Sequence, residues 1–322
     1  MPVAADEFLL PDYRVSRYRF TLRAINRIVL PRDRVGIILR GAFGLAFRKL
    51  VCHDLQAECR GCPLSGACPY ARVFTPSPPA DAERLRLQSD IPRPFVVAPD
   101  LEKGEEVRPA TLTQFELTLI GESVAWMPYF VVAFRALGEQ GIGPGRGRFV
   151  LESVVAEGRR GEPVYRFDQS VVRNIECEER PGAFPAGSVA GRWTVHYRTP
   201  TLLRSEGEAA EVPEFHHLVK RLRDRVNATQ YFYCGKAWEV DHRALGLAAE
   251  SVAIVQDAGR WVEQQRRSSR TGAVHAIPGY LGDVTYAGDM APFLPLLRVG
   301  ERINVGKAAT FGCGRIEIEP EG

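Results

Sequence analysis

The sequence lacks a hydrophobic run long enough to cross a membrane. Hydrophobic residues make up 45% of its 322 residues, which is typical of a globular protein. The longest apolar runs, such as residues 126–134, are far shorter than the about 20 residues that a spanning helix needs. A basic start followed by an apolar stretch is also missing, so we expect no secretory signal, no membrane partner and a cytoplasmic location.

A large charge of one sign is missing too, since the formal net charge is only +3. The distribution of arginine is more informative, because its planar guanidinium suits phosphates and stacks on bases. A solvated basic surface is the alternative interpretation of each cluster. The two clusters are Arg14, Arg17, Arg19, Arg23, Arg27, Arg32, Arg34, Arg40 and Arg48, and Arg260, Arg266, Arg267 and Arg270.

A basic, glycine-rich loop lies near the end of each half of the chain. Glycines let the backbone turn tightly and bring its N–H groups close to an anion, beside which lysine and arginine add positive charge. Residues 299–318 and, more weakly, residues 141–155 follow this plan and predict phosphate binding. The residues concerned are Gly306, Lys307, Gly312, Gly314 and Arg315 in the later loop, and Arg146 and Arg148 in the earlier one.

Strand and helix patterns recur in the same order in both halves. The first half predicts strands at 13–25, 112–120 and 149–155 and helices at 37–51 and 127–137. The second predicts strands at 193–197, 283–287 and 315–318 and helices at 213–226 and 291–297. We therefore expect an α+β fold of two tandem ferredoxin-like domains, residues 1–190 and 191–322. Residues 52–109, rich in cysteine, proline and charge, are expected to form an insertion in the first domain.

Four cysteines with the spacing C-x6-C-x2-C-x5-C predict a metal site in this insertion. Thiolates this close in sequence can surround one zinc ion or one four-iron cluster. The spacing matches the iron–sulfur loop of the endonuclease III family, whereas structural zinc is commoner in general, so both remain open. Buried structural cysteines are the alternative to a metal. The four are Cys52, Cys59, Cys62 and Cys68.

The order of several short motifs resembles the CRISPR repeat-processing endoribonucleases of the RAMP superfamily. The motifs are Trp261, residues 266–270, 279–288, 293–297, 305–307 and 311–314, together with the helix at 39–44 that includes Arg40 and the segment at 68–70. The resemblance implies tandem ferredoxin-like domains that bind CRISPR repeat RNA and cut it without metal in the cleavage chemistry. Asn304 stands where many relatives carry histidine, so the acid–base role must lie elsewhere or be absent.

Metal-free RNA cleavage needs a base for the attacking 2′-OH and an acid for the departing 5′ oxygen, and histidine is the usual choice near neutral pH. The sequence has only six histidines. His53 ends the first predicted helix, where related enzymes often carry a catalytic histidine; a surface or metal-neighbour role is the alternative. His216 and His217 open the basic helix at 213–226, and half-packed structural residues are the alternative.

These features predict an endoribonuclease that binds repeat RNA and yields crRNA, with other CRISPR effector subunits as further candidate partners. The RNA-binding candidates are the residues of the two loops with Arg40, Arg266, Arg267 and Arg270. A non-cleaving RNA-binding subunit of a CRISPR effector complex is the second interpretation. An iron–sulfur DNA-processing enzyme is a third, which the missing helix–hairpin–helix pattern disfavours.

Overall fold

The computed structural model describes residues 8–32, 34–78, 82–83, 91–100, 106–158, 161–169, 171–175, 177–183, 191–205, 207–267 and 273–321. The chain divides into two compact units. The N-terminal unit is Ser16–Glu179, and the C-terminal unit is Met1–Val15 together with Arg180–Gly322. None of the described helices is long and apolar enough to span a bilayer.

The expected domains were residues 1–190 and 191–322. In the structure the second unit begins at Arg180, and the start of the chain also belongs to it. Phe8 and Tyr13 are fully buried there. The Phe8 ring lies 5.8 Å from that of Phe293, and the Tyr13 hydroxyl lies 2.8 Å from Thr229 Oγ1. The apolar side chains at 8–13 therefore complete a core that is otherwise made by the last 140 or so residues of the chain.

The N-terminal unit is built on a sheet with strand order β3-β5-β1-β6-β7, to which β8 adds by pairing with β1. The pairs β1–β6, β3–β5 and β6–β7 are antiparallel. Its strands are β1 (Val15–Ala24), β3 (Phe95–Pro99), β5 (Leu112–Ile120), β6 (Phe149–Ala156), β7 (Pro163–Arg166) and β8 (Glu178–Glu179), with a separate pair β2 (Ile28–Val29) and β4 (Glu106–Val107). Its helices are α1 (Val35–Val51), α2 (Pro69–Phe74), η1 (Gly121–Trp126) and α3 (Met127–Gln140).

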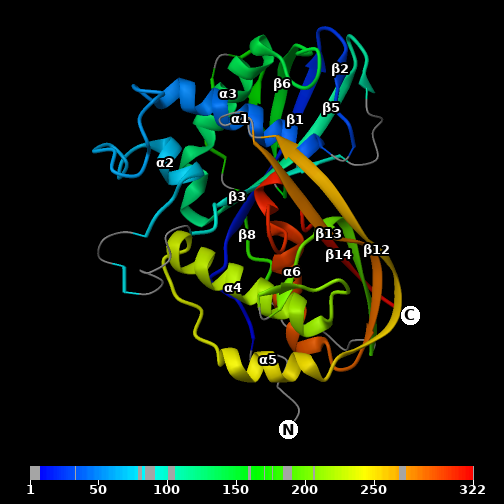
Figure 1. Ribbon diagram of the computed structural model, residues 1–322. Coiled ribbons are helices and arrows are strands. Elements are labelled where there is room, and N and C mark those ends of the chain that lie inside the picture. The colour runs from blue at the N-terminus through cyan, green and yellow to red at the C-terminus, as the bar shows by residue number, and fades with distance from the viewer. Residues whose placement is uncertain are drawn as a thin grey trace. The chain divides into compact units, whose positions relative to one another are not determined.

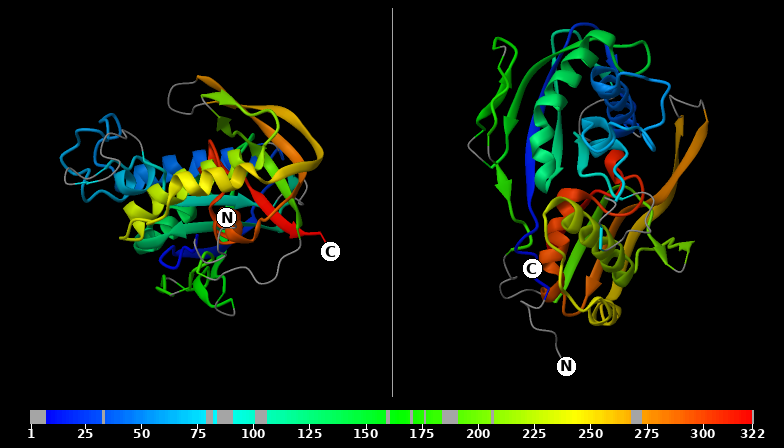
Figure 2. Two further views of the ribbon diagram at one scale, coloured as in Figure 1. Left: turned by 90° about the horizontal axis from the view of Figure 1, so that it is seen from below. Right: turned by 90° about the vertical axis from the view of Figure 1, so that its left-hand side faces the viewer.

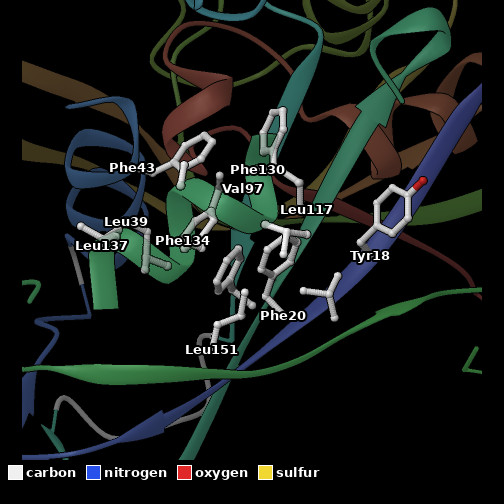
Figure 3. Packing of buried hydrophobic residues seen from close by; sticks show 14 of the residues in the cluster. Tyr18, Phe20, Leu39, Phe43, Val97, Leu117, Phe130, Phe134, Leu137 and Leu151 are labelled. Atoms are coloured by element: carbon white, nitrogen blue, oxygen red, sulfur yellow. The ribbon is translucent and has the colours of Figure 1, made fainter. Parts of the chain in front are cut away.

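Aromatic side chains dominate the core of this unit (Figure 3). The Phe43 ring from α1 lies 4.6 Å from the Phe134 ring of α3, and Phe20 of β1 lies 4.9 Å from Phe115 of β5. Alternation along β1 places Phe20 and Leu22 in this core. The predicted strand at 13–25 is thus confirmed, and its apolar face packs against the two long helices.

The C-terminal unit has a four-stranded antiparallel sheet with strand order β12-β13-β9-β14. The strands are β9 (Arg192–Thr201), β12 (Ala253–Arg267), β13 (Val274–Ala287) and β14 (Ile316–Pro320), with a small hairpin of β10 (Arg204–Ser205) and β11 (Glu208–Ala209). The helices are α4 (Phe215–Tyr233), α5 (His242–Glu250), η2 (Ala291–Phe293), α6 (Leu294–Ile303) and η3 (Ala309–Phe311). Figures 1 and 2 show α4 and α6 beside this sheet.

Strands β12 and β13 form a ribbon longer than the rest of the sheet (Figure 1). Their pairing continues to Arg267↔Val274, whereas β13 leaves β9 at Tyr280↔Thr201. Beyond that point the ribbon has two strands only. Most described side chains of β12 are exposed, including those of Val255 and Trp261.

One expectation about this architecture is wrong, and another gave only part of a strand. Residues 95–99 lie inside the segment 52–109 expected as an insertion, yet they form β3, the edge strand of the main sheet. The strand expected at 283–287 is confirmed but is longer, since β13 begins at Val274 and continues through Gly279 and Gly282. A Cβ on Gly282 would approach the Gly259 Cα to 2.3 Å, so this glycine permits close approach within a sheet and does not form a turn.

Candidate functional site

Helix α4 carries the pair of histidines singled out in the sequence. Phe215, Leu218, Val219 and Leu222 recur with helical spacing and are all buried. This apolar stripe fixes the helix on its unit. It leaves His216 and His217 in the first turn, each partly exposed.

The two imidazoles lie side by side next to a carboxylate. Their ring centroids are 4.1 Å apart, and His216 Nδ1 lies 3.3 Å from Glu214 Oε2. One ligand atom from each of the three residues lies within 4.8 Å of the others, so this cluster is also compact enough for a metal ion. One turn further on, Lys220 Nζ lies 2.8 Å from Glu250 Oε1.

His217 has the properties of a base. Burial, and then the neighbouring His216, lower the pKa of His217 below its ordinary value of 6.5. Its Nδ1 is buried and has no hydrogen-bond partner among the described residues. A neutral imidazole can accept a proton, and an unpaired buried polar atom is often found at functional sites.

His53 lies apart from this cluster in sequence and belongs to the N-terminal unit. It is exposed, it follows the end of α1, and it lines a cavity with the four cysteines. This position fits the alternative interpretation of His53 as a neighbour of a metal site.

The four cysteines come together around that one cavity, which Leu64 and Tyr70 also line. All four are free thiols. Within the described part of the chain, no three of their sulfur atoms lie within 4.8 Å of one another.

The later glycine loop is held by its own backbone. Gly312 N–H donates to Ala309 O at 3.0 Å, and Gly314 N–H donates to Pro200 O at 3.1 Å. A Cβ on Gly314 would lie 1.7 Å from Val305 O. These two amides are therefore engaged within the fold, and the expectation that they face an anion is wrong for both. Gly312 closes the loop on itself, and Gly314 fastens it to Pro200 near the end of β9.

Asn304 acts in the same loop. It is buried, its backbone has a φ of 59°, and its Nδ2 donates to Cys313 O at 3.0 Å. The residue that replaces the expected histidine thus fastens the loop and has no exposed acid–base group.

The cations of this loop differ in their surroundings. Lys307 is exposed, and its side chain makes no ion pair with any described residue. Arg315 is half-buried, and its Nη2 lies 3.0 Å from Glu317 Oε1. Lys307 is therefore the more accessible cation, while Arg315 is partly neutralised. Gly306, just before Lys307, has a φ of 76° and leaves room for Leu202 O.

The earlier glycine loop presents two exposed arginines, Arg146 and Arg148. Arg146 has a φ of 49°, and its N–H donates to Gly143 O at 3.1 Å. A Cβ on Gly143 would lie 2.2 Å from Val29 O, so this glycine packs the loop against β2. The loop tip is basic and accessible.

The remaining RNA-binding candidates are less informative. The Arg40 guanidinium lies 5.2 Å from the Phe74 ring centroid and covers the aromatic core. Arg266 and Arg267 lie at the end of β12, where only the backbone is described. Arg270 lies outside the described residues.

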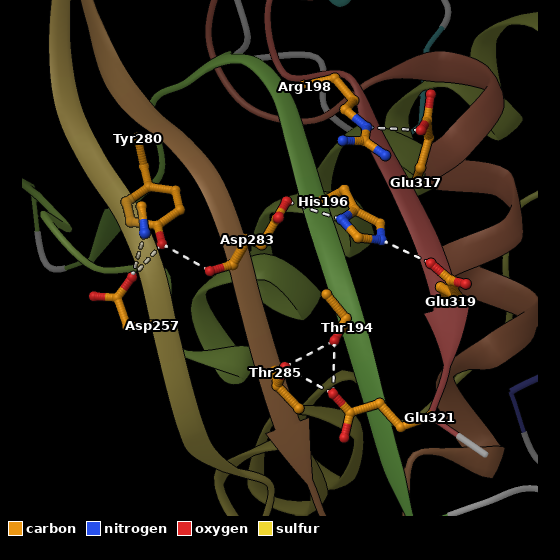
Figure 4. A network of polar contacts seen from close by, with 11 residues as sticks. Thr194, His196, Arg198, Asp257, Tyr280, Asp283, Thr285, Glu317, Glu319 and Glu321 are labelled. Atoms are coloured by element: carbon orange, nitrogen blue, oxygen red, sulfur yellow. Dashed lines mark hydrogen bonds and ion pairs between the residues drawn. The ribbon is translucent and has the colours of Figure 1, made fainter.

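The sequence analysis missed an acidic network on one face of the C-terminal sheet (Figure 4). His196 Nδ1 lies 2.8 Å from Asp283 Oδ1, and its Nε2 lies 3.2 Å from Glu319 Oε2. Glu317 accepts from Arg198, and Glu321 accepts from threonine hydroxyls of β9 and β13. Alternation of polar residues along β9 and β14 was the available signal. Such a concentration of carboxylates disfavours phosphate binding on this face.

Two family models match the chain. The model AF_1859_N, described as an N-terminal domain, matches residues 10–177, slightly more than half of the chain. The model described as CRISPR-associated endoribonuclease Cas6 matches residues 195–316. None of the curated proteins compared with the chain matches it.

Several solved structures share the fold. A Cas6 product complex is 16% identical, with 95% of this chain and 99% of that chain covered and a TM-score of 0.53. Thermus thermophilus Cas6 gives the same identity and coverages with a TM-score of 0.51. A partial Cas6-RT-Cas1–Cas2 complex is 12% identical, with 98% of this chain and 47% of that chain covered and a TM-score of 0.55. At these identities the likeness shows the fold alone.

Proposed function

Because the chain belongs to the AF_1859_N family and to the CRISPR repeat-processing proteins of the RAMP superfamily, we propose that it binds CRISPR repeat RNA and cleaves precursor crRNA. The observation that carries this proposal is the cluster of Glu214, His216 and His217. It lies within the segment that matches the Cas6 endoribonuclease model. We place the protein in the cytoplasm, with the crRNA and other CRISPR effector subunits as its partners.

Each unit is, in this proposal, a ferredoxin-like domain. The strand order β3-β5-β1-β6 in one unit matches β12-β13-β9-β14 in the other. In both, helices connect the first strand to the second and the third to the fourth. Folds of this kind recur in RNA-binding domains, and function is assigned here from the site and not from the fold.

His217 is the general base in this mechanism. Its lowered pKa keeps the imidazole neutral near pH 7, so it can take the proton of the 2′-OH that attacks the adjacent phosphate. His216, oriented through Nδ1 by Glu214, donates a proton to the departing 5′ oxygen. Lys220 adds positive charge near the phosphate, although Glu250 shares that charge.

Cleavage proceeds, in this proposal, through these side chains without a metal ion. The test is a repeat-RNA cleavage assay in EDTA with wild type, His216→Ala and His217→Ala. We expect wild type to cut and each variant to lose on the order of a hundred- to ten-thousand-fold in rate, while RNA affinity stays within a few-fold.

His53→Ala is the matched comparison in the other unit. A large loss of rate in that variant alone would move the catalytic role to His53 and overturn the assignment to α4. Cleavage by wild type only after a divalent metal is added would overturn the metal-free mechanism and make Glu214, His216 and His217 candidate ligands. Full binding with no cleavage under either condition would identify a non-cleaving RNA-binding subunit.

A further inference from the structure

We propose that the four cysteines of the N-terminal unit bind a four-iron, four-sulfur cluster. This proposal is independent of RNA cleavage and of the histidines on α4. The cluster site is defined by Cys52, Cys59, Cys62 and Cys68.

The segment that carries these cysteines has no core of its own. Between the end of α1 and the start of α2 it forms only turns, and each residue from Cys52 to Cys68 is exposed or partly exposed. Leu55 and Leu64 remain 44% and 54% exposed. A segment of this kind needs a further group to hold it, since apolar burial contributes little here.

The cysteines nevertheless converge. All four line one cavity, together with His53 and Tyr70. Short backbone bonds set the turns between them, with Cys62 N–H donating to Cys59 O at 3.3 Å and Cys68 N–H to Leu64 O at 2.8 Å. Four thiols around one space, with no disulfide between them, form a closed ligand set.

The grouping of the sulfur atoms is wider than a zinc site requires and leaves room for the cluster. Tetrahedral zinc with bonds of about 2.3 Å brings its four sulfurs to about 3.8 Å from one another. No three of these sulfurs lie within 4.8 Å of one another in the described residues. A cubane cluster binds each thiolate at a different iron corner, so its ligands stand farther apart around a larger space.

The surroundings also fit a group of negative charge. The Arg48 guanidinium, at the end of α1, lies beside the Cys52 thiol and interacts with that of Cys59. The same guanidinium lies 5.7 Å from the Tyr70 ring centroid and donates to Ala57 O. Transfer of a preformed cluster from a thiolate-ligated carrier is a ligand exchange. Four Fe–S bonds to the carrier break, four form to these cysteines, and the protons of the four S–H groups pass to the departing thiolates. A fixed cation stabilises the resulting anionic site.

The bound cluster would join the end of α1 to the start of α2. Cys52 directly follows α1, and Cys68 directly precedes α2. We therefore expect the cluster to order residues 52–74, while the sheet of the N-terminal unit forms without it.

The test is anaerobic purification of the full chain followed by iron, sulfide and zinc analysis and visible and electron paramagnetic resonance spectra. We expect about four iron and four sulfide per chain, a broad visible absorption and a paramagnetic signal on reduction or oxidation. Cys59→Ser and Cys62→Ser should lose iron and sulfide, while Cys177→Ala, which changes a thiol far from the site in sequence, should retain them.

Stoichiometric zinc without iron would overturn the proposal, as would a wild-type chain that takes up no cluster on anaerobic reconstitution. The wild-type measurement decides the question even if a cysteine variant fails to fold. Repeat-RNA cleavage serves as a separate readout, and its loss or retention leaves the metal assignment unchanged.

Discussion

At the scale of single residues, burial decides the protonation of His217. Its pKa lies below 6.5 in the folded protein because the ring is partly buried and adjoins His216. As pH falls through 6.5, the unfolded chain takes up a proton at this position before the folded one does. The difference in pKa therefore leaves the stability of the folded protein intact above pH 6.5 and lowers it progressively as the pH falls below 6.5.

His217→Gln should reduce this pH dependence. Urea unfolding of wild type and variant at about pH 7.5 and about pH 5.5 measures the difference. We expect the variant to lose less stability than wild type on acidification. His275→Gln, which changes an exposed histidine, is the control and should behave like wild type. Equal losses in wild type and His217→Gln would contradict the assigned pKa direction.

Gly314 is the most constrained glycine of the later loop. Gly314→Ala combines a φ of 72° with a Cβ only 1.7 Å from Val305 O. Gly235 has a similar φ of 78° with nothing within 4 Å of its Cβ position. We expect Gly235→Ala to cost about 1–2 kcal/mol of unfolding free energy, and Gly314→Ala more than about 4 kcal/mol. Urea unfolding measures both, and similar costs would rule out the close contact.

At the scale of elements, accessible cations and paired cations should contribute differently to RNA binding. Lys307→Ala should weaken binding and lower the slope of log affinity against log salt by about one. Arg315→Ala should have a smaller effect, because Glu317 already pairs with that guanidinium. Fluorescence anisotropy with repeat RNA over a salt series measures both slopes.

The acidic face of the C-terminal sheet supplies the control for this series. Glu319→Gln removes one carboxylate beside His196 and should leave the salt slope unchanged, since we expect the carboxylates of this face to repel phosphates. A slope that changed as much in Glu319→Gln as in Lys307→Ala would place the RNA over the sheet face.

Elements with a buried face were predictable from the sequence, and elements without one were not. Alternation predicted β1 near its true position, and helical spacing predicted the first part of α4, which continues beyond the expected end at 226 to Tyr233. Strand β12 is exposed on most of its length and contains Gly259, so it has no apolar period. Strand β3 is a short apolar run next to prolines and was assigned to the insertion.

The candidate site was predictable in part for the same reason. His216 and His217 are adjacent in sequence, so the sequence alone placed them near each other. The Gly314 amide donates to Pro200 O. Pro200 is distant in the chain, and no local sequence pattern reveals such a pairing.

At the scale of the molecule, the two units differ in how the chain builds them. The N-terminal unit is one continuous segment, Ser16–Glu179, whereas the C-terminal unit needs residues from both ends. Within it, Leu10 N–H donates to Gly182 O at 2.7 Å, and Trp238 Nε1 donates to Leu9 O at 3.2 Å.

A fragment of residues 16–179 should therefore fold alone, while a fragment of residues 180–322 should be destabilised. The second fragment lacks the buried Phe8, Leu10 and Tyr13, and losing each large apolar side chain costs about 2–5 kcal/mol. Circular dichroism melting measures both fragments. Joining residues 1–15 to the second fragment through a flexible linker should restore its stability, and equal melting with and without that segment would contradict the division.

The long ribbon of the C-terminal unit leaves one side of β12 without a neighbour among the described strands. Its outward amide and carbonyl groups form a template that another extended chain can join. Asp257, Arg260 and Glu263 lie along this strand, and their charges discourage such pairing between copies of the protein. Replacing these three residues with apolar ones would remove that charge repulsion and promote edge-to-edge pairing between copies of the protein.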